Sequence, residues 1–418
     1  MQLLKNLLLF SVISFYFIAC STSSGDKSRH SNVDSSFYKA QKPGAVDPEK
    51  FLDYYNTVLA FYNTVLEPSG FNGGLLVAKN GSVIFEKYTG FSNIEKKEVI
   101  NEHSAFHLAS VTKTFTAMAV LKLVEENRIN LDDDVFKYFP GFPYSGITVR
   151  MLLNHRSGLP NYTYFLQELG WDVKKTSTNY DVLQYLVQYK PPLTHPIGKH
   201  FSYCNTNFAL LALIIEKVSG KTYSNFLSET FFKPLQMTDS YVFNMSDSAK
   251  AMPSYDFRGR REPLNFLDGE YGDKNIYSTP RDLLKWDQAL YSGQLFKKET
   301  LDEAFAPYSN EKPGIKNYGL GWRMNIYPNG KKMIFHTGWW HGNNTFLIRL
   351  PEDSATIIIL GNKYNRTIYQ AKNLINIFQH YFATSDDTDD ENPKELPLKN
   401  QQNDSILTNQ KLDSLRKK

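Results

Sequence analysis

Residues 107–121 have the sequence His107-Leu108-Ala109-Ser110-Val111-Thr112-Lys113-Thr114-Phe115-Thr116-Ala117-Met118-Ala119-Val120-Leu121, a polar start that leads into an apolar helix. Ser110 is expected at the N-terminus of this helix. Residues three apart share one helix face, so the Lys113 amine projects toward the Ser110 hydroxyl. A serine hydroxyl is a weak nucleophile until a neighbouring base takes its proton, and an amine acts as that base only in its neutral form, which burial favours. The stretch therefore predicts a nucleophilic serine activated by a lysine.

The spacing of Ser110 and Lys113 is weak evidence by itself, because a chain of this length can match it by chance. Ser24 and Lys27 match it too, but the polar residues around them cannot form an apolar helix that would desolvate the lysine. The plainer interpretation of Ser110 and Lys113 is an N-cap serine and a solvated helix lysine. The choice between the two interpretations depends on the rest of the sequence.

Two further motifs follow Ser110 along the chain. Tyr203 and Asn205 form a Tyr-x-Asn unit directly before an apolar helix expected over residues 208–218. Other Tyr-x-Asn matches, at residues 54–56 and 327–329, lie within an expected helix and in a hairpin turn. His336-Thr337-Gly338 lies on an expected strand and occurs once. The three motifs together favour the catalytic interpretation of Ser110.

The regions on either side of these motifs predict one antiparallel sheet. Residues 75–79 and 82–87 flank Asn80-Gly81, the pair favoured in a two-residue type I′ hairpin turn. Late strands are expected over residues 321–327, 332–337, 345–350 and 355–360, separated by turn-forming residues. Helices expected over residues 51–66 and 367–382 would cover the sheet, and the middle of the chain would form a mainly helical region. The expected fold class is therefore α+β.

In their order along the chain, Ser110–Lys113, Tyr203–Asn205 and His336–Gly338 resemble the motifs of the serine β-lactamase and penicillin-binding-protein superfamily. The similarity is to the class C β-lactamase-related branch, which contains carboxypeptidases, D-aminopeptidases and esterases. It extends to residues 151–160, 276–283 and 318–322 and covers about residues 50–383. The resemblance implies a β-lactamase/transpeptidase-like fold.

The resemblance also implies a role for each matching residue. Ser110 would attack a carbonyl carbon to form an acyl-enzyme, while Lys113 and Tyr203 handle the protons and water later hydrolyses the ester. Backbone N–H groups of Ser110 and Trp339 would form the oxyanion hole. The substrate-binding positions would be Asn205, His336, Thr337 and Gly338. This chemistry uses no cofactor.

His336 departs from the lysine that β-lactamases and transpeptidases carry at this position. An imidazole with an ordinary pKa of about 6.5 replaces a permanent cation, so we expect weaker or pH-dependent recognition of a substrate carboxylate. The bulky Trp339 and Trp340 beside it are poorly suited to a bicyclic β-lactam. A metal site at His336 and His341 is excluded, because an odd spacing on a strand places the two side chains on opposite faces. His155 is expected to form structural hydrogen bonds.

The first twenty residues have the pattern of a bacterial lipoprotein signal. Lys5 precedes an apolar run, residues 7–19, that is too short to span about 30 Å of hydrocarbon at about 1.5 Å per residue. Phe17-Ile18-Ala19-Cys20 resembles a lipobox, which predicts residues 1–19 as the signal peptide and Cys20 as the lipidated N-terminus. Cys204 would then be the one remaining thiol, expected to pack rather than react, and no intramolecular disulfide would form. We therefore expect an exported lipoprotein of the cell envelope, held at the outer membrane through lipid on Cys20.

Two polar segments flank the expected domain of residues 46–383. Residues 20–45 are Ser-rich and predict a flexible tether, and residues 384–418 predict a disordered, charged tail. The acidic cluster at residues 385–391 has no ordered ligand spacing, so no metal site is predicted there. The 47 basic and 43 acidic residues leave a net charge of +4, without the concentrated positive field that a nucleic-acid partner requires.

The sequence favours an exported serine hydrolase that acts on a small ester, a D-amino-acid amide or a peptidoglycan-type peptide. The alternative is a penicillin-binding-like sensor, which acylates without turnover or binds without chemistry, and a true β-lactamase is less favoured. Lys113 and Tyr203 together favour turnover, because a pure binding module has no evident need for both proton carriers. Residues 162–192 and 255–271, the expected cleft walls, carry no recognisable substrate code, and the oligomeric state is equally open.

Overall fold

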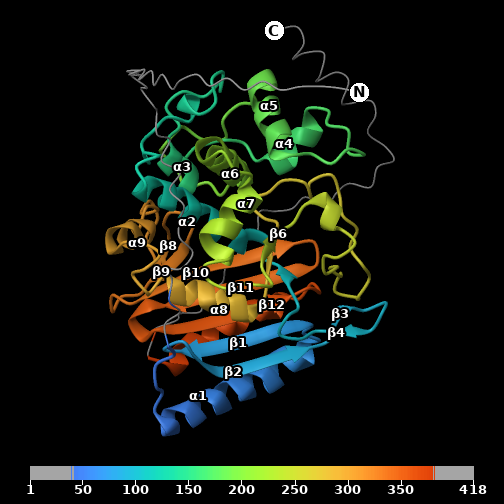
Figure 1. Cartoon of the computed structure of the whole chain (residues 1–418), viewed down its shortest axis with the longest axis vertical. Helices are drawn as coiled ribbons and strands as arrows, with labels where there is room; N and C mark the ends of the chain where they lie inside the picture. The colour runs from blue at the N-terminus through green and yellow to red at the C-terminus, as the bar shows by residue number, and fades with distance from the viewer. Residues whose placement is uncertain (1–38, 40–41, 380, 382–418) are drawn as a thin grey trace, which may run out of the picture. The chain divides into compact units, whose positions relative to one another are not determined.

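The computed structural model describes Lys39, residues 42–379 and Tyr381, and Figure 1 shows how the described elements are arranged. They form an α+β structure in which helices cover both faces of an antiparallel sheet, as the sequence predicted. The predicted signal peptide, Cys20 and the charged tail lie outside the described residues. Gly44 and Ala45, which we predicted as the end of the tether, contact the first hairpin instead. Gly44 N donates to Asn80 O at 2.7 Å, and Asn80 Nδ2 donates to Ala45 O at 3.2 Å.

Within the described residues the main sheet has seven strands in the order β2-β1-β12-β11-β10-β9-β8, and each neighbouring pair is antiparallel. The strands are β1 (Gly73–Lys79), β2 (Ser82–Thr89), β8 (Lys316–Tyr318), β9 (Arg323–Ile326), β10 (Lys332–Trp340), β11 (Asn343–Leu350) and β12 (Ala355–Gly361). β1 pairs with β12, so the early hairpin joins the late strands in one sheet. Asn80 and Gly81 have φ angles of 53° and 76°, the positive values that a type I′ turn requires.

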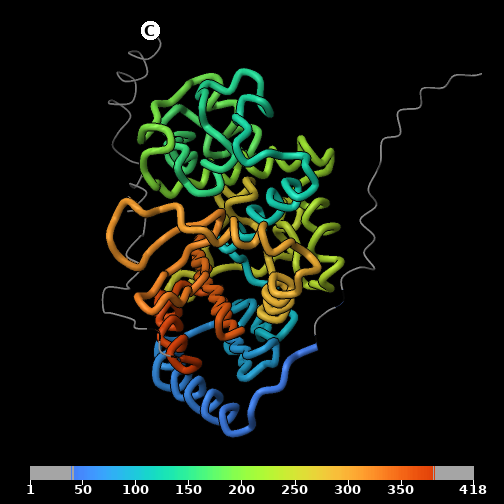
Figure 2. The backbone as a smooth tube through the Cα atoms, turned by 90° about the vertical axis from the view of Figure 1, so that its left-hand side faces the viewer, coloured from blue at the N-terminus to red at the C-terminus, as the bar shows by residue number. Residues whose placement is uncertain are grey.

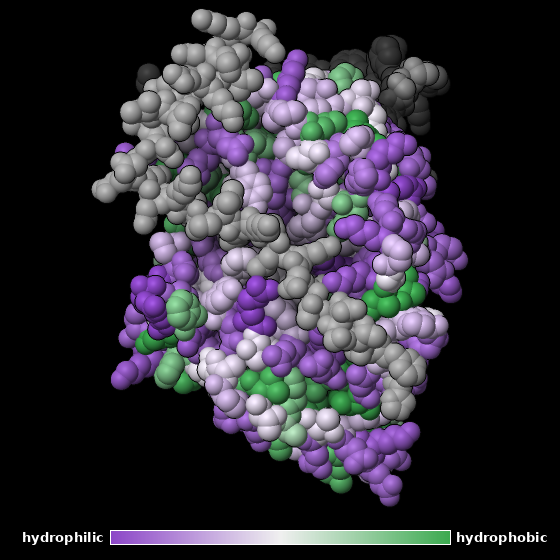
Figure 3. Space-filling model, turned by 180° about the vertical axis from the view of Figure 1, so that it is seen from behind, coloured by the Kyte–Doolittle hydropathy of each residue, from purple (hydrophilic) through white to green (hydrophobic). Residues whose placement is uncertain are grey.

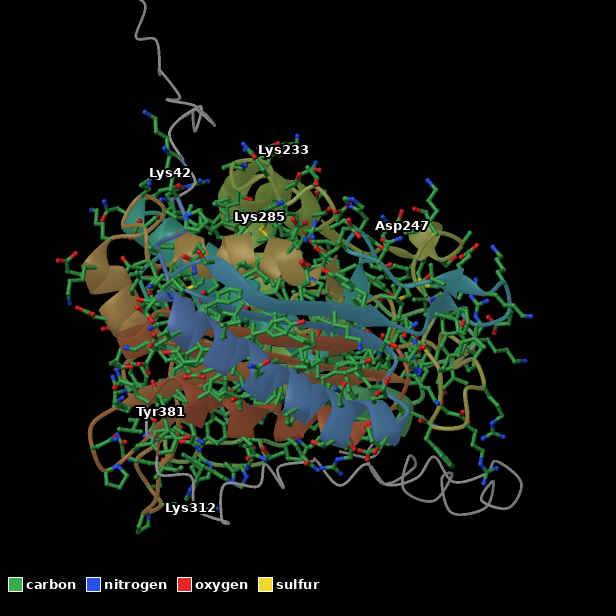
Figure 4. All side chains as sticks on the ribbon, turned by 90° about the horizontal axis from the view of Figure 1, so that it is seen from below. Lys42, Lys233, Asp247, Lys285, Lys312 and Tyr381 are labelled. Carbon is green, nitrogen blue, oxygen red and sulfur yellow. The ribbon has the colours of Figure 1, made fainter. Side chains whose placement is uncertain are left out.

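One face of the sheet is covered by the first and last helical segments. These are α1 (Pro48–Phe61), its continuation as a π-helical turn (Tyr62–Leu66), and η8 (Arg366–Ile377). Figure 4 looks onto this layer, with α1 in blue. The structure places a helix in the region where the sequence predicted the closing helix, residues 367–382, and this helix, η8, is of the 3₁₀ type. Its buried residues Ile368, Ala371 and Leu374 recur every three positions, the spacing that lines up on one side of a 3₁₀-helix.

The other face of the sheet packs against the helical part of the chain. α8 (Pro280–Ala289) lies on β1 and β12, and the central helix α2 (Thr112–Glu125) packs against α6 (Asn205–Ser219). Almost all of α2 is buried, including the polar residues of its first turns, so the helix has no solvated face along most of its length. The remaining α-helices are α3 (Val149–Leu153), α4 (Tyr162–Glu168), α5 (Asn179–Tyr189), α7 (Tyr223–Leu227) and α9 (Lys298–Ala304). Figure 2 shows the green middle of the chain gathered at one end and the blue and red segments, from early and late in the chain, at the other.

Two small sheets complete the described structure. β5 (Phe106–His107), β7 (Ile276–Ser278) and β6 (Tyr241–Val242) form one of them, and β3 (Phe91–Asn93) pairs with β4 (Glu98–Val99) in the other. β5 leads directly into η3 (Ala109–Val111), the turn that contains Ser110. On the face shown in Figure 3, hydrophilic and hydrophobic residues are mixed. None of the helices in the described residues is long and apolar enough to span a membrane.

Candidate active site

Ser110 lies in a 3₁₀-turn between β5 and α2, at the start of the buried helix. The residue before it, Ala109, has a φ of 47°, which a residue with a side chain seldom adopts. Contacts on both sides hold this strained turn: Leu108 N donates to Ile276 O at 2.8 Å, and Leu108 O accepts from Thr345 Oγ1 at 2.8 Å. The backbone strain is therefore maintained by the main sheet and by the small sheet together.

His107, two residues before Ala109, also holds this turn in place. Ala109 N donates to His107 Nδ1 at 3.1 Å, so the ring proton is on Nε2, which lies 2.8 Å from Asn275 Oδ1. Burial lowers the pKa of His107 to about 4, although the Asn275 hydrogen bond opposes the change. The imidazole is therefore neutral near pH 7, and its two hydrogen bonds support the turn that contains Ser110.

Lys113 lies in the first turn of α2, is fully buried, and points at Ser110. Its Nζ lies 3.0 Å from Ser110 Oγ and 2.9 Å from the backbone oxygen of Asp273. The rings of Tyr203 and Phe208 lie beside the amine, with their centres 4.9 Å and 5.7 Å away. The structure thus brings together the serine, the lysine and the apolar surroundings that the sequence predicted. When Lys113 is neutral, this geometry allows the Ser110 proton to pass directly to Nζ.

Tyr203 and Asn205 lie where the chain enters α6. The Tyr203 ring lies close to Lys113 and to Arg323, whose guanidinium carbon is 4.9 Å from the ring centre. Asn205 Oδ1 is buried and accepts no hydrogen bond from any residue that the structure describes. A buried acceptor without a donor is unfavourable, so this oxygen is suited to a donor on a bound substrate.

His155 supports Tyr203 from behind. It is fully buried, and its ring centre is 4.4 Å from that of Tyr203. Cys204 N donates to His155 Nδ1 at 3.1 Å, while His155 Nε2 lies 3.2 Å from the Tyr318 hydroxyl. Burial and the nearby Lys113 hold the pKa of His155 well below its ordinary value. These contacts agree with the structural role expected for His155, and burial raises the pKa of the Cys204 thiol, which agrees with a packing role.

His336 is fully buried on β10 and does not behave as the sequence predicted. Its Nδ1 donates to Thr337 O at 2.7 Å, so its Nε2 accepts from the Tyr318 hydroxyl at 3.3 Å. Burial first, and then the charges of Arg323 and Lys113, hold the pKa of His336 well below 6.5. The prediction that this imidazole titrates near pH 6.5 is therefore wrong, because the sequence did not reveal its burial.

The strand segment Thr337–Trp339 runs along the turn of Ser110. A Cβ atom added to Gly338 would clash with Leu108 O and lie 3.0 Å from Ala109 Cβ, so only glycine allows this close approach. Thr337 and Trp339 are partly exposed, and Trp339 Nε1 donates to His341 O at 2.9 Å. The contact at Gly338 places the backbone of Trp339 next to the turn of Ser110.

The tryptophan that follows is held by an acidic residue. Trp340 Nε1 donates to Asp268 Oδ1 at 2.7 Å, and His341 Nε2 lies 3.0 Å from both oxygens of the same carboxylate. The two tryptophans noted in the sequence are thus fixed in place. In the described part of the chain, no group of three or more His, Cys, Asp or Glu side chains is arranged to hold a metal ion.

Three site residues were missed by the sequence reasoning. Arg323 follows directly after the motif at residues 318–322, yet an arginine at a strand start gives no local signal of a place beside Tyr203. Tyr318 belongs to that same motif, and its hydroxyl joins His155 to His336. Asp273 contacts Lys113 through its backbone oxygen, which carries no signal of residue type.

The fold and the position of Ser110 define a β-lactamase/transpeptidase-like protein of the serine-hydrolase class. A family model described as Beta-lactamase matches residues 67–381. The chain therefore belongs to the β-lactamase family, within the serine β-lactamase and penicillin-binding-protein superfamily.

Relatives of known sequence agree with this assignment. Penicillin-binding protein 4* of Bacillus subtilis (strain 168) is 32% identical over 325 residues, which cover 74% of this chain and 72% of the relative. Protein flp of Staphylococcus aureus (strain MRSA252) is 29% identical over 69% of this chain. This chain spans 58% of the length of that second relative.

Solved structures show the same fold. A penicillin-binding protein from Bacillus halodurans has a TM-score of 0.66 at 24% identity, covering 75% of this chain and 97% of its own. The octameric penicillin-binding protein homologue from Pyrococcus abyssi has a TM-score of 0.66 at 26% identity, with 76% and 77% coverage. D-amino acid amidase from Ochrobactrum anthropi SV3 has a TM-score of 0.62 at 22% identity, with 78% and 98% coverage.

Proposed function

We propose that this protein is an exported serine hydrolase that forms an acyl-enzyme on Ser110 and releases the acyl group to water. The observation that carries the proposal is the 3.0 Å contact between the buried Lys113 Nζ and Ser110 Oγ. A buried amine has little solvent to stabilise its charged form, and a base at hydrogen-bonding distance is what a serine nucleophile needs.

In the proposed reaction, Ser110 Oγ attacks the substrate carbonyl carbon and passes its proton to Lys113. Tyr203, beside Lys113, carries a proton between the lysine and the leaving group. The backbone N–H groups of Ser110 and Trp339 stabilise the oxyanion, and the close approach at Gly338 supports this pairing. Water then attacks the acyl-enzyme by the reverse proton route and frees Ser110.

The proposed substrates are a small ester, a D-amino-acid amide or a peptidoglycan-type peptide. Asn205 Oδ1 is a buried acceptor suited to an amide N–H. Arg323 places a positive charge beside Tyr203, where a substrate carboxylate would be attracted. Trp339 and Trp340 leave efficient hydrolysis of a bicyclic β-lactam as the less favoured activity.

Hydrolysis of p-nitrophenyl acetate tests the nucleophile. We expect Ser110→Ala to abolish turnover, and Ser24→Ala to leave it unchanged. Ser24 is the matched control because Lys27 follows it at the same spacing, within a polar stretch of sequence. Equal rates for wild type and Ser110→Ala would overturn the proposal. Intact mass spectrometry after mixing with the ester separates turnover from a sensor, since a persistent adduct on Ser110 would favour the sensor.

The proposed localisation rests on the sequence of residues 1–20, with a lipid on Cys20 as the membrane contact. Expression in a bacterial host with an alkyne-labelled fatty acid tests it. The wild-type chain should take up the label and fractionate with membranes, and Cys20→Ala should do neither. Labelling of Cys20→Ala to the wild-type level would rule out this acylation site.

A further inference from the structure

A buried cluster of charged residues lies behind Lys113. Its members Glu270, Asp273 and Lys274 are each no more than 3% exposed. Lys274 Nζ lies 3.2 Å from Glu270 Oε2 and 3.7 Å from Asp273 Oδ2. Burying charged groups is unfavourable unless they are paired and hydrogen-bonded, and apolar residues would pack this space more simply. The contacts of this cluster should therefore show why charged residues are buried here.

Asp273 connects this cluster to Lys113. Its backbone oxygen accepts a hydrogen bond from Lys113 Nζ at 2.9 Å. Its side-chain Oδ2 accepts from the Tyr162 hydroxyl at 2.8 Å, and that hydroxyl in turn accepts from Lys274 Nζ. The position of the carbonyl depends on the position of its residue, so Tyr162 and Lys274 determine where the second acceptor of Lys113 lies.

Gly272 and Lys274, on either side of Asp273, hold residues 272–274 close to both sides of the active site. Gly272 O accepts from Thr116 Oγ1 of α2 at 2.6 Å, one helical turn beyond Lys113. A Cβ atom on Gly272 would lie 2.6 Å from Phe208 O, so the segment packs tightly against α6. On the other side, Lys274 Nζ lies 4.9 Å from the centre of a Trp340 ring, next to Trp339 on β10.

We propose that Tyr162, Glu270 and Lys274 are positioning residues, which hold the Asp273 carbonyl against Lys113 and thereby keep Lys113 Nζ on the Ser110 hydroxyl. This inference rests on the proposed serine-hydrolase function. Glu270 pairs with Lys274 and also accepts a hydrogen bond from Ser177, so the ammonium group cannot move away from Tyr162.

The variant Tyr162→Phe tests this arrangement, because it removes the hydroxyl between Asp273 and Lys274 without a change of charge. We expect kcat for p-nitrophenyl acetate to fall about 10²-fold with KM nearly unchanged, since a small misplacement of a catalytic group costs about that much. A loss confined to kcat would show that Lys113 is misplaced on Ser110, because a loss of substrate binding would raise KM.

The titratable groups near Lys113 stay the same in both proteins, so the kinetic comparison is made against wild type. Those that face it are Tyr203, Cys204, His155, Arg323 and His336. Within the cluster, burial raises the pKa of Glu270 to about 7, although Lys274 opposes the shift. Asp268 and Asp273 add their charges around Lys274.

Tyr381→Phe is the matched control. The Tyr381 hydroxyl donates to Asp353 Oδ2 at 2.5 Å, and Lys331 Nζ lies 4.0 Å from the same carboxylate oxygen. This second trio of tyrosine, aspartate and lysine belongs to the core beneath α1 and η8, where Figure 4 labels Tyr381. The control should lower the thermal midpoint as Tyr162→Phe does and leave kcat and KM at wild-type values.

Wild-type values of kcat and KM in Tyr162→Phe would overturn the inference, as would equal kinetic losses in both variants. If Tyr162→Phe does not fold, Glu270→Gln takes its place, since the amide keeps an acceptor for Ser177 and replaces the carboxyl oxygen that pairs with Lys274. It should lower kcat about 10-fold, and wild-type values would then count against the inference. The proposed function fails separately, if wild-type hydrolysis does not depend on Ser110.

Discussion

The guanidinium carbon of Arg323 lies 4.9 Å from the centre of the Tyr203 ring. Arg323 begins β9 and pairs across the sheet with Phe335, the residue before His336. His336 is buried, and its pKa lies well below 6.5, so its imidazole is uncharged near pH 7. Arg323, on the neighbouring strand, therefore places a positive charge beside Tyr203 and near His336.

Replacing Arg323 with glutamine should discriminate between substrates. For an ester that carries a carboxylate, such as p-nitrophenyl monosuccinate, we expect Arg323→Gln to lower kcat/KM about 10- to 100-fold, because a hydrogen bond to a charged group contributes about 1.5–3 kcal/mol. For neutral p-nitrophenyl acetate, the change should be about twofold or less. Arg281→Gln is the control, since Arg281 pairs with Glu86 at the surface. Equal losses for the two esters would mean that Arg323 supports Tyr203 and does not bind a substrate carboxylate.

Removing the Tyr203 hydroxyl should impair proton transfer and leave the fold intact. Phenylalanine keeps the ring contacts with Lys113, Arg323 and His155. General acid–base groups contribute about 10²–10⁴-fold, so Tyr203→Phe should lower kcat/KM for p-nitrophenyl acetate by at least about 10²-fold. Tyr180→Phe, at an exposed tyrosine of α5, serves as the control. Wild-type kinetics in Tyr203→Phe would remove the hydroxyl from the mechanism.

Much of the sheet could be predicted because its signals are local. Asn80-Gly81 determines a hairpin by its own backbone preferences, and short stretches between turn-forming residues mark the late strands. The type of the last helix could not be predicted, since Ile368, Ala371 and Leu374 suit an α-helix and a 3₁₀-helix equally well at this level. In the folded chain, the 3₁₀-helix η8 packs against β11 and β12, contacts that the local pattern does not reveal.

The same distinction applies to the candidate site. Ser110 and Lys113 are three residues apart, so helical geometry alone brings them together. Asp273 lies 160 residues from Lys113 in the sequence and contacts it through its backbone oxygen. No pattern of side chains predicts such a contact. The neutral state of His336 also depends on tertiary structure. Burial lowers the pKa of its imidazole, and the side chain is buried only once β10 has packed into the sheet.

The buried histidines should make the protein less stable in mild acid. The pKa of His107 is lowered to about 4 by burial, and those of His155 and His336 lie well below the ordinary value. Each group binds more protons in the unfolded chain, so the free energy of unfolding decreases as pH falls through about 6.5. Glu270 acts in the opposite direction, because burial raises its pKa to about 7 and favours its protonated form in the fold.

Urea unfolding of wild type and His107→Asn at pH 7 and pH 5 measures this effect. From the two pKa values, His107 should account for about 2 kcal/mol of the stability lost between these pH values, and the variant should lose that much less. His200→Asn, at an exposed histidine, should keep the wild-type pH dependence. The same pH dependence in wild type and His107→Asn would mean that His107 is not held neutral by the fold.

The contact between Gly338 and the Ser110 turn should be sensitive to a single methyl group. A Cβ atom at Gly338 would clash with Leu108 O and Thr345 Oγ1, and the strand can relieve that clash only by moving away from the nucleophile. We expect Gly338→Ala to lower kcat/KM about 10²-fold or more, because the Trp339 N–H would leave the oxyanion position. Gly361→Ala on β12 is the matched control, since its Cβ would lie 3.3 Å from the nearest atom, Asn72 O. Thermal unfolding of both variants separates loss of fold from loss of chemistry. A folded Gly338→Ala enzyme with wild-type activity would exclude this strand from oxyanion stabilisation.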